Sequence, residues 1–163
     1  MIQPVTQTMK VASAGSSIVA EIEIAAPPDI VFDALTNPAD LAAWWGAEGV
    51  YRTHDWKIDL RPGGEWSCLA TQAGTGTVMT VRGTYLEIDR PRALAYTWMP
   101  SWEKELPATE VRYTLSPVSG GTRVQVEHTG FEGFPQSQQG HVMGWQRVFE
   151  WLSGYCSAKA VAK

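Results

Sequence analysis

The sequence is poor in cysteine and has no long apolar run. Its 163 residues contain two cysteines, Cys68 and Cys156, which are far apart and outside any CxxC spacing. This usage fits reduced thiols in a cytoplasm and argues against a disulfide framework. No stretch approaches the roughly 20 apolar residues of a membrane span, and residues 1–16 hold no apolar run of signal-peptide length. We therefore expect a soluble, cytoplasmic protein with no membrane span.

Charged residues are also scarce, and the basic ones do not cluster. They make up 18% of the chain, the net charge is -4, and no run of lysine or arginine offsets it. A phosphate backbone would be repelled on average, so we expect no nucleic-acid partner. The histidines His54, His128 and His141 match no usual ligand spacing, so we expect no metal and no cofactor.

Tryptophan, by contrast, is abundant and spread along the chain. The eight tryptophans are Trp44, Trp45, Trp56, Trp66, Trp98, Trp102, Trp145 and Trp151. Each indole covers a large area and carries an N–H that needs a partner, so a domain of this size cannot easily pack all of them into one solid core. We expect several of them to line a cavity or its mouth. Such a cavity is typical of a protein that holds an apolar or aromatic small molecule.

Residues 17–129 are predicted to form strands, with two short helices inserted after the first strand. Residues 17–24 alternate between apolar and polar side chains, which indicates a strand with one solvated face. Two short helices follow, with Pro28 in the first turn of one and Asn37 capping the other. Residues 51–129 alternate in several short stretches separated by turns, which predicts an antiparallel meander.

The last predicted element is a long amphipathic helix from about residue 137 or 139 to about 160. Its apolar stripe runs from His141 through Trp145 to Cys156, so we expect it to lie across the concave face of the sheet. This gives an α+β architecture with a curved antiparallel sheet, two short helices and one long C-terminal helix. We assign residues 1–16 to a flexible N-terminal tail and residues 17–161 to a single domain.

An ordered set of short motifs resembles a known family. The motifs are Pro28-x-x-Val31-Phe32-x-Ala34-Leu35-Thr36-Asn37-Pro38, Trp44-Trp45-Gly46, Asp59-x-Arg61-Pro62-Gly63-Gly64, Gly121-Thr122-Arg123, His128-x-Gly130-Phe131 and Gly144-Trp145. Together they resemble the activator-of-Hsp90-ATPase-like family, within the superfamily of lipid-transfer, birch-pollen-allergen and polyketide-cyclase-like proteins. The resemblance implies the helix-grip fold with seven strands and a hydrophobic cavity. It implies no single activity, because this fold hosts transport, sensing, cyclisation and chaperone work.

We interpret the chain as a carrier or sensor of a hydrophobic or aromatic small molecule, held between the C-terminal helix and the sheet. The predicted lining consists of Trp45, Trp66, Tyr96, Trp98, Trp102, Tyr113, His128, His141, Trp145, Phe149 and Leu152. The loop between Pro100 and Pro107 lacks strand alternation, so Trp102 is a candidate lid residue. His128 and His141 are expected at the same end of the cavity, either as binding groups or as satisfied core histidines.

Two other functions stay open at this stage. A cyclase-like or hydrolase-like enzyme could use His128 as a base and Tyr96 or Tyr113 as a hydrogen-bond donor. The pattern shows no nucleophile with its base and no facing carboxylate pair, so we assign no catalytic residue. A cochaperone role would need the separate N-terminal domain of the named cochaperone, and residues 1–16 are too short and polar to replace it. We therefore expect no chaperone partner, while a role as another kind of protein-interaction module and a homodimer stay open.

Overall fold

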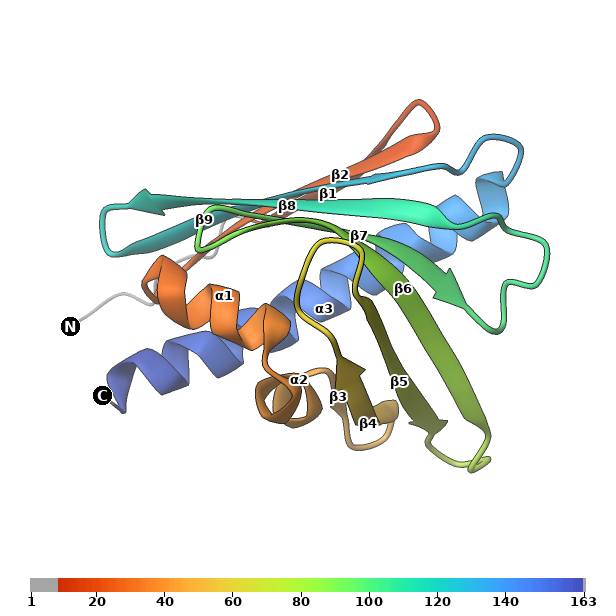
Figure 1. Cartoon of the computed structure of the whole chain (residues 1–163), viewed down its shortest axis with the longest axis horizontal. Coiled ribbons are helices and arrows are strands. Elements are labelled where there is room, and N and C mark those ends of the chain that lie inside the picture. The colour runs from red at the N-terminus through yellow and green to blue at the C-terminus, as the bar shows by residue number, and fades with distance from the viewer. Residues whose placement is uncertain (1–8, 163) are drawn as a thin grey trace.

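The fold, described for residues 9–162 by a computed structural model, combines one antiparallel sheet with three helices. The strands are β1 (Met9–Ala14), β2 (Ser17–Ile24), β3 (Gly46–Ala47), β4 (Tyr51–Ile58), β5 (Glu65–Gln72), β6 (Val78–Asp89), β7 (Ala93–Pro100), β8 (Thr109–Val118) and β9 (Gly121–Thr129). The helices are α1 (Pro28–Thr36), α2 (Pro38–Trp44) and α3 (Pro135–Val161). The sheet curves around α3, which runs along its inner side (Figure 1). The predicted α+β helix-grip class is confirmed.

The sheet has nine strands in the order β1-β2-β9-β8-β7-β6-β5-β4-β3, whereas seven were predicted. The two additional strands are its edges, β3 and β1. Strand β1 pairs with β2 from Met9↔Ile22 to Ala14↔Ser17. The prediction of a flexible tail is therefore wrong for residues 9–14, because backbone pairing with β2 orders a segment whose side chains alternate weakly. The rest of that predicted tail, residues 1–8, lies outside the described residues.

The two short helices begin where the sequence predicts. Pro28 lies in the first turn of α1, where a missing N–H costs no helical hydrogen bond. Asn37 ends α1 and caps α2, since its Oδ1 accepts hydrogen bonds from the N–H groups of Ala39, at 2.9 Å, and Asp40, at 3.4 Å. Helix α1 then packs against β8, β9 and α3, so the insertion closes one end of the sheet.

Helix α3 is anchored near its C-terminal end by a polar contact with α2. The Asp40 carboxylate is largely buried and accepts hydrogen bonds from the Tyr155 hydroxyl and, at 2.5 Å, from Lys159 Nζ. A buried carboxylate needs such partners, because burying it alone is costly. The contact fixes this end of α3 against α2, and the helix also packs against α1, β1 and β2.

Candidate functional site

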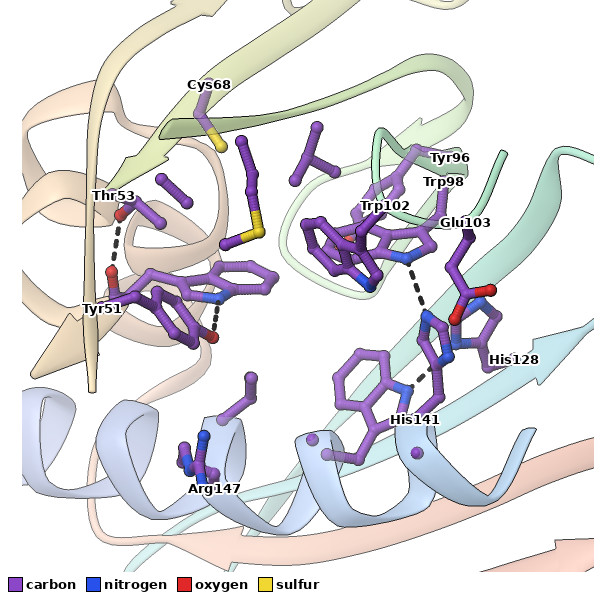
Figure 2. Close-up of a pocket in the computed structure, with 18 of the residues that line it drawn as sticks. Tyr51, Thr53, Cys68, Tyr96, Trp98, Trp102, Glu103, His128, His141 and Arg147 are labelled. Atoms are coloured by element: carbon purple, nitrogen blue, oxygen red, sulfur yellow. Dashed lines mark hydrogen bonds between the residues drawn. The ribbon is translucent and has the colours of Figure 1, made fainter. Parts of the chain in front are cut away.

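A pocket of about 280 Å³ lies between the first half of α3 and strands β4 to β7 (Figure 2). Its lining is mostly apolar. It consists of Trp45, Tyr51, Thr53, Trp56, Cys68, Ala70, Met79, Val81, Tyr96, Trp98, Trp102, Glu103, His128, Gly140, His141, Gly144, Trp145, Arg147 and Val148. Five of the eight tryptophans of the chain are in this set, and they lie directly after α2, in β4, in β7, in the loop after β7 and in α3.

The indoles form one continuous aromatic wall. Trp45 stacks on Trp44 with ring centroids 5.0 Å apart and on Trp98 at 6.0 Å. Trp66 lies behind this wall, 6.0 Å from Trp56 and 5.9 Å from Trp98, and does not line the pocket. Offset and tilted stacking of this kind fixes each ring through its neighbours. The wall therefore holds its shape without a side chain filling the space in front of it.

Trp44 and Trp45 are adjacent in the sequence but have different roles. Both rings are buried. Trp44 donates its Nε1–H to the carbonyl of Ala34 at 2.7 Å, which ties α2 to α1. Trp45 instead faces the pocket and donates to the Tyr51 hydroxyl at 3.3 Å.

His128 is held by protein groups on both ring nitrogens. Its Nδ1 accepts from Trp145 Nε1–H at 3.1 Å, so Nε2 carries the proton and donates to Thr109 Oγ1 at 2.7 Å. The Thr109 hydroxyl then donates to the carbonyl of Trp98 at 3.4 Å. Burial, with a smaller contribution from His141, lowers the pKa of His128 to about 3. The ring is therefore neutral at pH 7 and fixed in one tautomer.

His141 is satisfied in the same way. Its Nε2 accepts from Trp98 Nε1–H at 3.1 Å, and its Nδ1 donates to the carbonyl of Ser137 at 2.8 Å. Burial lowers its pKa, against smaller opposing effects of the Ser137 carbonyl and Glu103. The two imidazoles lie 5.4 Å apart at one end of the pocket, as the sequence pattern predicts (Figure 2).

These contacts do not favour the cyclase-like arrangement. A general base needs a free lone pair and a pKa near the working pH, and His128 has neither. Tyr96 and Tyr113 hydrogen-bond to each other at 3.2 Å, and burial raises the pKa of both hydroxyls. Cys68 also faces the pocket, and burial raises the pKa of its thiol to about 12, which keeps it protonated.

The end of the pocket opposite the histidines carries a threonine, a tyrosine and an arginine. Thr53 donates to the carbonyl of Trp45 at 2.5 Å and accepts from Trp56 Nε1–H at 3.1 Å, so its hydroxyl hydrogen is already used. Tyr51 and Arg147 lie at this end, away from the histidines (Figure 2). The pocket thus has an apolar middle with polar groups at its two ends.

One wall of the pocket consists of helix backbone. Gly140 and Gly144 are one turn apart on α3 and both face the pocket. A Cβ at either position would meet no atom within 4 Å, so both face open space. Each glycine costs a helix interior about 1 kcal/mol relative to alanine. This wall gives the pocket room that any side chain would take up.

The predicted lining residues divide into two groups. The structure brings seven of them together around the pocket: Trp45, Tyr96, Trp98, Trp102, His128, His141 and Trp145. The remaining four, Trp66, Tyr113, Phe149 and Leu152, do not line it and are buried in the packed core beside it. These four side chains point to the inner faces of the sheet and of α3 as predicted. Neighbouring side chains cover them, so they do not reach the pocket.

Sequence reasoning missed the contribution of β4. Thr53 and Trp56 both face the pocket although they are three positions apart, an odd spacing that puts side chains on opposite faces of a regular strand. Strand β4 has a bulge between His54 and Lys57, and Asp55 has a φ of 53°. A bulge inserts one residue and reverses the alternation after it. The only sequence signal at this point is the His54-Asp55 pair, since aspartate tolerates positive φ better than most residues.

A helix laid along a curved antiparallel sheet, with an apolar pocket between them, defines the helix-grip class of proteins. A family model for Activator of Hsp90 ATPase homolog 1-like proteins matches residues 25–157. The chain belongs to this family. No curated protein matches the chain.

Solved structures have the same fold over nearly the whole chain. A protein from Chromobacterium violaceum is 25% identical, with a TM-score of 0.76 over 88% of this chain and 99% of its own. A protein from Mycobacterium smegmatis is 22% identical, with a TM-score of 0.79 over 96% of this chain and 98% of its own. One from Arthrobacter aurescens is 20% identical, with a TM-score of 0.79 over 91% of each chain.

Residues 9–162 hold neither a metal-binding cluster nor a helix suited to cross a membrane. No three histidine, cysteine, aspartate or glutamate side chains in this range gather as a metal ion would require. None of the helices in the same range is both long and apolar enough to cross a membrane.

Proposed function

We propose that this protein binds a hydrophobic or aromatic small molecule in the pocket and serves as its carrier or sensor. The observation that carries the proposal is the aromatic wall combined with internally satisfied polar groups. Trp98 and Trp145 use their N–H groups on His141 and His128, so these rings present apolar surface to the pocket. An apolar molecule entering it would leave none of these groups without a partner.

The size of the pocket sets the size of the ligand. An engineered apolar cavity of about 150 Å³ holds benzene, so about 280 Å³ suits a molecule of roughly two fused rings. Tryptophan rings on several sides favour a planar molecule, because aromatic pairs gain energy in stacked and edge-to-face arrangements.

Native mass spectrometry of freshly purified protein tests whether such a molecule accompanies the chain. Calorimetric titration with naphthalene derivatives then measures binding directly. Gly144→Leu supplies the decisive variant, since its side chain would occupy the open wall while the helix gains a better helix former. We expect it to melt at the same or a higher temperature and to bind at least about tenfold more weakly, as a loss of about 1.4 kcal/mol gives.

Gly154→Leu is the matched control. Gly154 lies on the same helix, also has open space around its Cβ, and does not line the pocket. It should gain stability and keep its affinity. Equal affinities of wild type and Gly144→Leu would contradict binding in this pocket.

A further inference from the structure

The charged side chains of the pocket are separated. Arg147 is the only cation and Glu103 the only carboxylate in its described lining. Glu103 lies near His141, whereas Arg147 projects from α3 at the end where Tyr51 lies (Figure 2). The two charges therefore do not neutralise each other, and an elongated ligand would meet them at opposite ends.

Arg147 has no carboxylate partner among the ion pairs of residues 9–162. Its guanidinium lies over the ring of Trp151, 5.9 Å from the centroid, and Trp151 packs edge-on against Tyr51 at 5.5 Å. A guanidinium placed on an aromatic face keeps its charge and its N–H donors available. The Arg147 guanidinium is thus positioned at the pocket, and no salt bridge neutralises its charge.

Tyr51 adds a directed hydrogen-bond donor at the same end. Its hydroxyl oxygen accepts from Trp45 Nε1–H, and this uses an oxygen lone pair and leaves the hydroxyl hydrogen. Tyr51 and Arg147 both contact the ring of Trp151, so the two groups lie at the same end of the pocket (Figure 2). A guanidinium fork beside an O–H donor matches a carboxylate, whose two oxygens accept in one plane.

Building on the proposed function, we infer that the ligand is an apolar monocarboxylic acid whose carboxylate is bound by Arg147 and Tyr51 while its body lies against the indole wall. One negative charge is favoured over two because one arginine faces the pocket, Glu103 shares it, and the chain as a whole carries a net charge of -4. A dianionic phosphate would meet an unbalanced charge.

Three probes of one shape test the inference by calorimetry at pH 7: naphthaleneacetic acid, naphthaleneacetamide and naphthylethylamine. The wild type should bind the acid about tenfold more tightly than the amide, the lower end for a hydrogen bond to a charged group, because Arg147 is exposed and solvent screens its charge. The amine should bind most weakly. Raising the salt concentration should reduce affinity for the acid and leave the amide unchanged.

Arg147→Gln should reduce the preference for acid over amide to within about twofold, because the charge is gone while the wall is intact. Arg52→Gln is the matched control, since it makes the same charge change beside Tyr51 but outside the pocket lining. Tyr51→Phe should lower acid affinity alone, with melting curves reporting any effect on the fold.

The outcomes of these titrations distinguish recognition of a carboxylate from binding of an apolar ligand. Tight and equal binding of acid and amide, unchanged by Arg147→Gln, overturns the carboxylate inference and leaves apolar binding intact. Preference for the amine overturns it as well and makes Glu103 the dominant group. Failure of all three probes to bind the wild type overturns both the apolar-ligand proposal and this inference.

Discussion

The two halves of α3 pack against the same sheet and yet create opposite interiors. The C-terminal half presents Phe149, Leu152 and Cys156, none of which has any exposed surface, to a filled core. The N-terminal half presents Gly140, Gly144 and Trp145 to the pocket. Compact aliphatic and phenyl side chains can interdigitate until no space is left, whereas indoles held by mutual stacking cannot move into space that glycine leaves empty.

The comparison shows that a cavity needs support as well as missing volume. Around the pocket, each polar group of the wall is fixed by another: Trp145 by His128, His128 by Thr109, and Trp98 by His141. In the filled half, close packing of Phe149, Leu152 and Cys156 maintains the shape, and the contact of Asp40 with Tyr155 and Lys159 anchors the helix end.

Leu152→Ala should reduce the free energy of unfolding by about 2 to 5 kcal/mol, since it removes a fully buried side chain from a close-packed site. The pocket is lined by other residues, so binding of naphthalene derivatives should change by less than about twofold while the variant is folded. Urea melts and calorimetry measure the two quantities. A large loss of affinity would show that the filled half and the pocket behave as one cavity.

Acid should destabilise the pocket half. In the unfolded chain His128 takes up a proton below its usual pKa of about 6.5, whereas in the fold its pKa is about 3. The unfolded state therefore binds more protons between these values, and stability falls as the pH decreases through that range. We expect a loss of about 2 to 3 kcal/mol from this group by pH 4.5, at about 1.4 kcal/mol per pH unit. Urea melts from pH 7 to 4.5 that are independent of pH would contradict the neutral ring.

His128→Leu should cost about 1 to 3 kcal/mol at pH 7, because Trp145 Nε1–H and the Thr109 hydroxyl lose their partner in a buried site. The variant should also lose much of the acid sensitivity described above. Melts of wild type and variant at two pH values measure both effects. Unchanged stability together with a weaker affinity for polar-headed ligands would instead make His128 a binding residue.

Trp102 should have the smallest effect on stability and a clear effect on binding kinetics. Its side chain lines the pocket, yet the residue is 48% exposed and lies between Pro100 and Pro107 in a segment without strand pairing. Trp102→Ala should change stability by no more than about 0.5 kcal/mol and should speed ligand release. Amide exchange at residues 101–105 should be fast in the free protein and slow with ligand. Equal exchange in both states would exclude a lid.

Local patterns were enough to predict most of the elements. The alternation of residues 17–24 is seen in β2, and the Asn37 amide makes the capping contacts expected of it. These features depend on side chains close in sequence. The inner face of α3 also followed from its spacing, which correctly placed Trp145 and Phe149 toward the sheet.

What the sequence could not show depends on contacts between distant segments. Strand β1 is ordered by its partner β2, and its own residues carry little alternation. The bulge at Asp55 moves Trp56 to the pocket face against simple parity. Phe149 and Leu152 share the inward stripe of α3 with Trp145, but only three-dimensional packing decides where the pocket stops.

The stacking of the indoles also has a consequence for the tryptophan fluorescence of the protein. Neighbouring ring centroids from Trp44 through Trp45 and Trp98 to Trp66 are 5.0 to 6.0 Å apart. At such separations we expect excitation to pass from one indole to the next before emission. A quencher bound against Trp45 alone would therefore dim the emission of rings that it never touches.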